Sequence, residues 1–391
     1  MYPRSGLQVV LGVIGVLAFF IYLLACRPSW SPDGSKILFR AVDSTGAGVA
    51  LLDVKTGRAR MLFVEGATEE GGNAEESVAS VQWARDGQRA IVVLMDNNQI
   101  TRLLFTPVGS KRPARLVFLE ELGAKEYSVF MPLPERNGQL FIPGKKLARV
   151  DLETGLVRSW EADSAEAVSL AEWDGSIVYA MKSHGETPGW EFGEVDPESL
   201  ALRPFLRLEQ ADLGARFEAA GLGLKELSLP HLAPEPHGTR LALKASTSQG
   251  DVIVVLDRTG FRQVLRTRPE PAGCVIGNLQ WAPGGKLLYA VDLMRQAGSD
   301  SVQYSLGEVP LDGGPARLDP IDRFEGKSSS REDDFFYQIA LSPDGKRIAT
   351  VAPSDDPHDP RGGGLYLIDL RSPQRRTIRI PMPGLAGLRK S

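Results

Sequence analysis

The sequence predicts an all-β protein, a β-propeller of about seven four-stranded blades preceded by one N-terminal membrane segment. Three observations support this prediction: one turn motif recurs along the chain, a second turn follows each copy, and an uncharged apolar stretch lies near the N-terminus. The 41 glycines and 27 prolines make up about 17 % of the 391 residues, against roughly 12 % in an average protein. That excess favours many short strands joined by tight turns.

The first turn motif consists of a Trp or Leu, a small residue, Pro, Asp and Gly, followed by a β-rich run. Clear copies begin at Trp30, Trp83, Trp281 and Leu341, and weaker ones cover 133–138, 173–175 and 232–238. Proline presets φ at the first corner, Asp can bond nearby backbone, and Gly accepts the left-handed conformation that closes a hairpin. Structural, turn-forming roles are therefore expected for Trp30, Pro32, Asp33, Gly34, Trp83, Asp86, Gly87, Trp281, Pro283, Gly285, Pro343, Asp344 and Gly345.

A second turn follows each copy by roughly twenty to thirty residues, as a hairpin repeat requires. It is clearest at 53–57, 151–155 and 257–260, and looser at 107–109, 196–198, 312–314 and 369–371. Two hairpins in each unit give four strands, and seven units between residues 27 and 378 give about 50 residues each, the period of a propeller blade. The weaker copies leave six or eight blades open.

The copies with Trp-Ser-Pro-Asp-Gly resemble the TolB-like, WD-repeat-like β-propeller family, and the resemblance covers everything after residue 26. It implies a bacterial periplasmic or cell-surface protein that binds partners rather than catalysing a reaction. TolB itself carries an α/β domain before its propeller, and this sequence has no room for one. A role in the Tol system is therefore not expected.

The N-terminal segment has no charged side chain between Ser5 and Cys26, and residues 7–25 are almost wholly apolar. A helix of that length covers about 28 Å, close to the roughly 30 Å of a hydrocarbon core. Two interpretations stay open. The segment is an uncleaved transmembrane anchor, or Leu23-Leu24-Ala25-Cys26 is a lipoprotein signal and Cys26 is acylated. Residues 1–26 are thus expected to form the anchor or signal, and residues 27–391 the propeller.

The side of the membrane follows from two opposing signals. Arg4 is the only basic residue before the segment, whereas Arg27, Lys36 and Arg40 follow it, so the positive-inside rule alone would leave the bulk of the chain in the cytoplasm. The lipobox-like tetrapeptide and the family resemblance favour the opposite side. We predict a membrane-anchored propeller on the extracytoplasmic side, periplasmic or cell-surface.

No catalytic pattern stands out. The sequence has no Gly-x-Ser-x-Gly elbow and no phosphate-binding Gly-rich loop, and its histidines, His184, His231, His237 and His358, lack metal-ligand spacing. We therefore predict no enzyme activity, no cofactor and no metal. The two cysteines exclude a disulfide framework. A net charge of −4 gives no basic footprint, so nucleic acid is not expected as a partner.

These observations favour a non-catalytic protein-interaction or envelope scaffold module, held to the membrane by its N-terminal segment and bound to another envelope protein. Binding is expected on the membrane-distal face or on the long loops 65–77 and 322–334, while a short helix is expected within 208–221. The alternative is a propeller that senses a small ligand or cation, or a hydrolase with an unrecognised site. The segments expected to line the centre show few matched polar groups, which disfavours this alternative.

Overall fold

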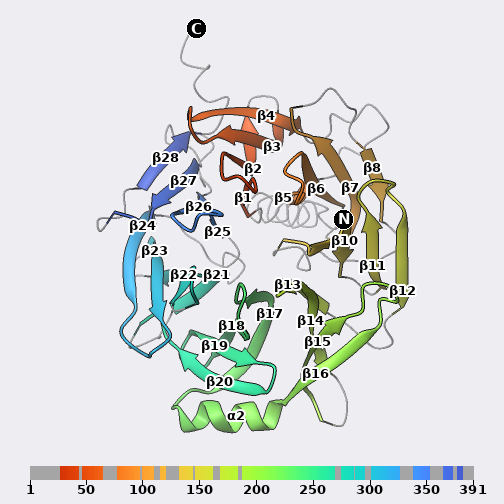
Figure 1. Ribbon diagram of the computed structural model, residues 1–391. Helices are drawn as coiled ribbons and strands as arrows, with labels where there is room; N and C mark the ends of the chain where they lie inside the picture. Colours follow the sequence, from red (N-terminus) through yellow and green to blue (C-terminus); the bar gives the residue numbers. More distant parts are fainter. Residues whose placement is uncertain are drawn as a thin grey trace, which may run out of the picture.

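The described part of the chain contains 28 strands, which form seven four-stranded antiparallel sheets arranged as blades around a central axis (Figure 1). The computed structural model describes residues 27–43, 46–64, 77–96, 99–109, 115–119, 132–143, 146–161, 168–183, 187–268, 274–285, 287–295, 301–325, 338–352, 364–372 and 377–381.

The first four blades are built from consecutive strands. Blade 1 contains β1 (Ser29–Trp30), β2 (Lys36–Asp43), β3 (Gly46–Asp53) and β4 (Arg58–Val64). Blade 2 contains β5 (Ser77–Trp83), β6 (Arg89–Asp96), β7 (Gln99–Pro107) and β8 (Arg115–Phe118). Blade 3 contains β9 (Glu135–Arg136), β10 (Gln139–Ile142), β11 (Lys146–Asp151) and β12 (Val157–Glu161). Blade 4 contains β13 (Val168–Trp173), β14 (Ser176–Ser183), β15 (Gly189–Val195) and β16 (Leu202–Glu209).

The last three blades follow the same plan. Blade 5 contains β17 (Leu224–Pro234), β18 (Arg240–Thr247), β19 (Asp251–Asp257) and β20 (Gly260–Leu265). Blade 6 contains β21 (Cys274–Trp281), β22 (Leu287–Arg295), β23 (Ser301–Pro310) and β24 (Arg317–Glu325). Blade 7 contains β25 (Ile339–Leu341), β26 (Arg347–Ala352), β27 (Gly364–Asp369) and β28 (Thr377–Pro381).

Each blade takes its four strands from one continuous stretch of chain, with the first strand innermost. The predicted all-β propeller with four-stranded blades is confirmed, and the number of blades in the described chain is seven. Among the described strands, none is exchanged between the first and the last blade, so the ring closes through side-chain contacts.

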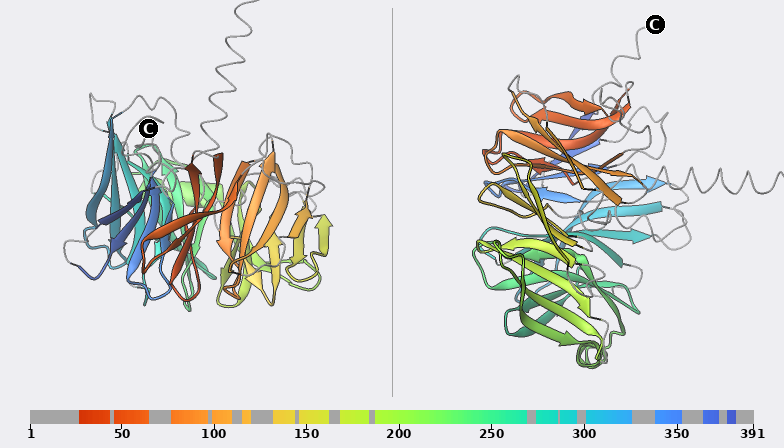
Figure 2. Two further views of the ribbon diagram at one scale, coloured as in Figure 1. Left: turned by 90° about the horizontal axis from the view of Figure 1, so that it is seen from above. Right: turned by 90° about the vertical axis from the view of Figure 1, so that its right-hand side faces the viewer.

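The strand directions give the ring two distinct faces. We call turn face the side formed by the turns that join the first to the second strand and the third to the fourth strand of every blade. We call loop face the opposite side, where the second strand connects to the third and each blade connects to the next (Figure 2). Because β1 starts toward the loop face and β28 ends there, the described chain both enters and leaves the ring on that side.

The turns between first and second strands are of two kinds. In five blades, residues seven apart pair across a longer turn, as Trp30 pairs with Ile37. Blades 3 and 4 instead have two-residue hairpin loops, Asn137-Gly138 and Asp174-Gly175, with positive φ at both residues. Positive φ at both central residues is what a type I′ turn requires, and Asn-Gly and Asp-Gly favour it.

The weak copies predicted at 173–175 and 232–238 both contain a turn, but their spacing differs from that of the clear copies. In blade 5 the residue at the position of Trp30 is Pro234, which pairs with Leu241, and not Leu232. In blade 4 Trp173 pairs with Ser176, four residues closer than the general spacing. Its ring consequently packs toward the next blade rather than the preceding one, with Nε1 donating to Gly238 O at 2.8 Å.

Apolar side chains fill the spaces between neighbouring blades. The cluster that closes the ring combines Trp30, Ile37 and Phe39 of blade 1 with Ala349 and Leu365 of blade 7, all buried. Because each central strand is covered by a blade on either side, it is apolar on both faces, which is why β19 contains the run Val252–Leu256.

The helix expected within 208–221 is present as α2 (Gln210–Ala219), at the outer edge between blades 4 and 5 (Figure 1). Its buried residues are Leu213 and Phe217, which lie four residues apart on one face of the helix. The Phe217 ring packs edge-on to the Phe261 ring, with 6.4 Å between the ring centroids. No helix within the described ranges is long and apolar enough to cross a membrane. The predicted anchor or signal, residues 1–26, lies outside the described residues.

Candidate functional site: the central channel and the turn face

The inner strands of neighbouring blades are joined by polar side chains rather than by strand pairing. Ser29 Oγ accepts a hydrogen bond from the backbone N–H of Trp83 at 3.1 Å. In the same register, Gln82 Oε1 accepts from Leu133 N at 2.7 Å, and Gln280 Oε1 accepts from Leu341 N at 3.0 Å. These inner-strand polar groups are thus occupied in holding blade to blade, and they leave backbone groups at the channel satisfied.

A second contact between blades pairs an arginine with a tryptophan. Trp30 Nε1 donates to Ala340 O at 2.8 Å, and the Arg347 guanidinium lies 5.1 Å from the centre of the Trp30 ring. Trp281 repeats this arrangement between blades 6 and 5, with Arg240 5.0 Å from its ring. Cation–π contacts of this kind contribute about 0.5–2 kcal/mol each. Trp30 and Trp281 therefore face the preceding blade and not the solvent.

The aspartates of the motif bind their own turns. Asp33 Oδ1 accepts from Ser31 Oγ at 2.6 Å and from Ser35 N at 3.0 Å. These hydrogen bonds lower the pKa of Asp33 to about 2; the bond from the Ser31 hydroxyl has the largest effect and the bonds from Ser35 the next largest. Ser342 Oγ lowers the pKa of Asp344 in the same way. At neutral pH these carboxylates are ionised and already hydrogen-bonded.

The prolines and glycines of the motif meet across the blade boundaries. A Cβ built on Gly34 would lie 3.7 Å from Pro343 Cδ, and one on Gly87 would lie 3.4 Å from Pro32 Cδ. At Gly345 the added carbon would come closer than 3.0 Å to Pro283, a separation that real Cβ contacts essentially never show. The structure thus places the predicted turn residues at the joints between blades.

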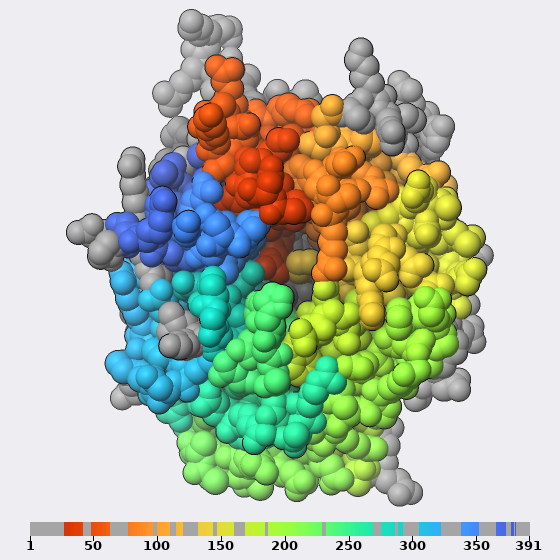
Figure 3. Space-filling model, in the orientation of Figure 1, coloured from red at the N-terminus to blue at the C-terminus, as the bar shows by residue number. Residues whose placement is uncertain are grey.

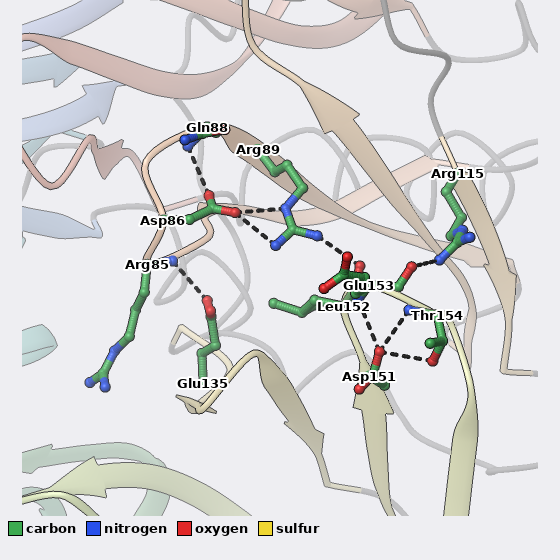
Figure 4. Close-up of polar contacts among 10 residues, drawn as sticks. All are labelled: Arg85, Asp86, Gln88, Arg89, Arg115, Glu135, Asp151, Leu152, Glu153 and Thr154. Atoms are coloured by element: carbon green, nitrogen blue, oxygen red, sulfur yellow. Dashed lines mark hydrogen bonds and ion pairs between the residues drawn. The ribbon is translucent and has the colours of Figure 1, made fainter.

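Blades 2 and 3 are joined by a different contact, in which an arginine binds a carboxylate and a backbone carbonyl instead of covering a tryptophan ring (Figure 4). Arg89 bonds Asp86 of its own turn and donates to Leu152 O of blade 3 at 2.8 Å. The Arg85 backbone N–H donates to Glu135 Oε2 at 2.9 Å. Glu135 is buried, and desolvation raises its pKa.

The side chain of Arg85 also joins two blades on the turn face. Its guanidinium pairs with the carboxylate of Glu172. Arg85 belongs to blade 2 and Glu172 to blade 4, so the pair bridges blades that are not neighbours and passes in front of the short inner strand β9. Both side chains are partly solvent-accessible, at 56 % and 29 %. The space-filling view of this face shows a hollow at the centre of the ring (Figure 3).

Deeper in the ring, Arg27 makes a second contact between blades that are not neighbours. Its Nη2 donates to Gln280 Oε1 at 2.8 Å. Arg27 leads into blade 1 and Gln280 lies on the inner strand of blade 6, with blade 7 between them, so this side chain must lie inside the channel. Desolvation by the surrounding ring lowers the Arg27 pKa to about 10, which still leaves the group charged at neutral pH.

Arg27, Arg85 and Glu172 were not among the residues expected to form a site. A signal for Arg27 does exist: it stands three residues before Trp30, as Asn278 stands before Trp281 and Gln338 before Leu341. The pairing of Arg85 with Glu172 depends on which blades face each other across the ring, and no local pattern carries that information.

Metal-binding geometry is absent from the described residues, where no three His, Cys, Asp or Glu side chains come together. His237 is exposed in the turn of blade 5 with a φ of 56°. His184 and His358 lie outside the described residues, as does the lipidation candidate Cys26.

Fold and contacts define the class of this protein: a seven-bladed β-propeller in which charged side chains link blades that are not neighbours. Residues 25–126 match the family model described as the lipoprotein LpqB beta-propeller domain. That match covers about a quarter of the chain, including blades 1 and 2. No curated protein matches.

Several solved structures are similar in fold. The Dos1 propeller is 10 % identical, with 92 % of this chain and 84 % of that chain covered and a TM-score of 0.46. Hydrazine synthase of Kuenenia stuttgartiensis is 13 % identical, with 85 % and 93 % covered and a TM-score of 0.49. Hsv2 of Kluyveromyces lactis is 11 % identical, with 92 % and 99 % covered and a TM-score of 0.46. At such identities and scores these likenesses carry no argument about binding or activity.

Proposed function

We propose that the protein is a non-catalytic scaffold module of the TolB-like kind, anchored to the membrane at its N-terminus, that binds another envelope protein through its turn face on the extracytoplasmic side. The observation that carries the proposal is the direction of the first blade. The chain enters the ring from the loop face and inside the channel, so an anchor immediately before Arg27 leaves the turn face pointing away from the bilayer.

The extracytoplasmic location is supported by the match to a lipoprotein propeller model, which begins at Ala25 beside the candidate Cys26. Two of the three basic residues that argued for the cytoplasmic side have places inside the fold. Arg27 lies in the channel, and Arg40 is buried in β2 with 5 % of its surface exposed. Their presence after the apolar segment is therefore explained by the ring itself.

Of the two surfaces expected from the sequence, only one is compatible with this orientation. The stretch expected as a loop at 65–77 lies between β4 and β5 and includes Ser77 of β5, and the one expected at 322–334 begins with the last residues of β24, which extends to Glu325. These strand ends lie at the loop face, on the side where the chain enters. Binding at those loops would take place against the membrane. The distal surface is the turn face.

The turn face suits protein recognition because its side chains are already held in place. Each described turn between a third and a fourth strand begins with an aspartate or a proline, and the aspartates bond the turn backbone. Asp151, for example, accepts from Thr154 N at 2.6 Å and Thr154 Oγ1 at 2.8 Å. Side chains ordered before binding lose less conformational entropy on association.

The anchor is tested by metabolic labelling with palmitate. If Cys26 is acylated, Cys26→Ser abolishes incorporation of label and leaves the N-terminus uncleaved. If residues 1–26 are an uncleaved transmembrane anchor, the wild type takes up no label at Cys26 and the substitution changes nothing. Release of the wild-type protein from membranes by high salt alone would contradict both forms of the proposal.

The binding face is tested by photo-crosslinking in intact cells. A photoreactive amino acid replaces Gln88, which is exposed in the first turn of blade 2, or Arg158, which is exposed on the outer strand β12 as a matched control. We expect a discrete crosslinked protein from position 88 and none from position 158. Equal crosslinking from both positions, or crosslinking only from 158, would refute the turn face as the binding surface.

A further inference from the structure

The channel holds a positive charge that the described protein does not neutralise. Arg27 has five N–H donors, and one of them is used, by Gln280 Oε1. Among the described carboxylates, none lies within ion-pair distance of its guanidinium. A desolvated cation without a counter-ion is costly, which distinguishes Arg27 from the arginines on the turn face, such as Arg371 with Asp369.

The residues at the corresponding sequence positions of three other blades are polar and uncharged. Asn278 and Gln338 stand three residues before Trp281 and Leu341, as Arg27 stands before Trp30, and Asn278 Nδ2 donates to Gln338 Oε1 at 2.7 Å. Both are buried, as is Ser80 at the corresponding position of blade 2. At these positions of blades 1, 2, 6 and 7 the described chain thus presents one cation, two neutral amides and a hydroxyl.

We propose that the channel is a binding site for a small oxyanion, a carboxylate or phosphate group, which pairs with the free edge of the Arg27 guanidinium. Planar guanidinium donors match the oxygens of either group, and the pairing is stronger inside a ring of low dielectric than in water. The inference does not depend on the proposed function, because it concerns the channel and not the turn face.

The depth of Arg27 favours a small ligand. Arg27 lies inside the ring, below the Arg85–Glu172 pair at the rim of the turn face, so a ligand must be narrow enough to enter the ring to reach it. Arg85 gives that rim a positive charge that its partly exposed carboxylate partner balances. This places the preference on small free anions rather than on the side chains of a docked domain.

The test uses the full chain in detergent, in chloride buffer of constant ionic strength, with sodium phosphate in one arm and sodium succinate in the other. Thermal unfolding and titration calorimetry report binding. We expect a rise in Tm in at least one arm, and the arm that responds identifies the class of anion. Arg27→Gln should weaken that binding at least tenfold, whereas Arg158→Gln on the outer strand β12 should leave it unchanged.

A second variant separates binding from folding. Gln280→Glu keeps the oxygen that accepts from Arg27 and Leu341, and adds a carboxylate as a built-in counter-ion. It should raise Tm in the absence of added anion and weaken anion binding at least tenfold. No response of the wild type to either anion would overturn the proposal. So would equal anion binding by the wild type and Gln280→Glu, or a lower Tm in Gln280→Glu than in the wild type.

Discussion

Replacing Gly345 by alanine tests whether the turns of neighbouring blades act as one joint. Gly345 has a φ of 68°, and its Cα faces Pro283 of blade 6, so an added methyl group meets two obstacles. A left-handed conformation costs a non-glycine residue about 1–2 kcal/mol. Forcing a carbon into a packed neighbour adds about 1–3 kcal/mol. We therefore expect Gly345→Ala to lower the free energy of unfolding by about 2–5 kcal/mol.

The chain supplies controls that separate the two effects. Gly57 has a φ of 66° but no atom within 4 Å of the added carbon, so Gly57→Ala should cost only the conformational part, about 1–2 kcal/mol. At Gly34 the nearest atom, in Pro343, is 3.7 Å away, an ordinary contact, and Gly34→Ala should behave like Gly57→Ala. Urea unfolding followed by tryptophan fluorescence gives the three values. Equal losses at Gly345 and Gly57 would show that the blade joint contributes nothing.

Three further substitutions examine the other joints. Gln82→Ala removes both hydrogen bonds between the Gln82 side chain and the Leu133 backbone. Because buried backbone groups lose their partners, the free energy of unfolding measured in urea should fall by about 1–3 kcal/mol. A loss below roughly 0.5 kcal/mol, the size of an ordinary surface effect, would contradict this. Ser31→Ala removes the main cause of the low Asp33 pKa. Because that pKa is depressed in the folded state, its stabilisation is present above about pH 4 and is lost toward pH 2. The difference in unfolding midpoint between wild type and variant should therefore be larger at pH 7 than at pH 2, where only the loss of the Ser31 bonds to the Lys36 backbone remains; the same difference at both pH values would refute it. Arg347→Ala uncovers the Trp30 ring and should cost about 0.5–2 kcal/mol, and an unchanged midpoint would mean that the contact does not help to close the ring.

The repeated hairpins could be predicted because turn chemistry is local. Pro32, Asp33 and Gly34 each have a backbone requirement that can be read without knowing the rest of the fold, and the same holds for their counterparts in blades 2, 6 and 7. The degenerate copies were harder, because blade 5 replaces the tryptophan by Pro234 and blades 3 and 4 use a shorter turn. Their strand pairing fixes the alignment, and pairing is a property of the folded chain.

The channel could not be predicted in the same way. Arg27 looked like a charge flanking the apolar segment, and its contact with Gln280 joins residues 253 positions apart. From the sequence we expected few matched polar groups near the centre and so missed Ser29, Gln82 and Gln280. Each of these side chains stands one residue before the tryptophan of its motif and accepts a hydrogen bond from a backbone N–H of the next blade. Because one is a serine and two are glutamines, they do not look alike in the sequence. Function at the centre of a ring depends on distances across it, which sequence periodicity does not report.

The contiguity of the blades has a consequence for how the chain matures. A blade whose four strands are adjacent in sequence can complete its sheet as soon as those strands have been synthesised, since its contacts are local. Blade 1 is the exception in one respect: the partner of its indole N–H, Ala340, lies 310 residues further along the chain. Until blades 6 and 7 arrive, Trp30 and Arg27 are without their partners. An incomplete chain therefore exposes an aromatic ring and a cation at its oldest end, and those two residues are concealed together when the last blade docks.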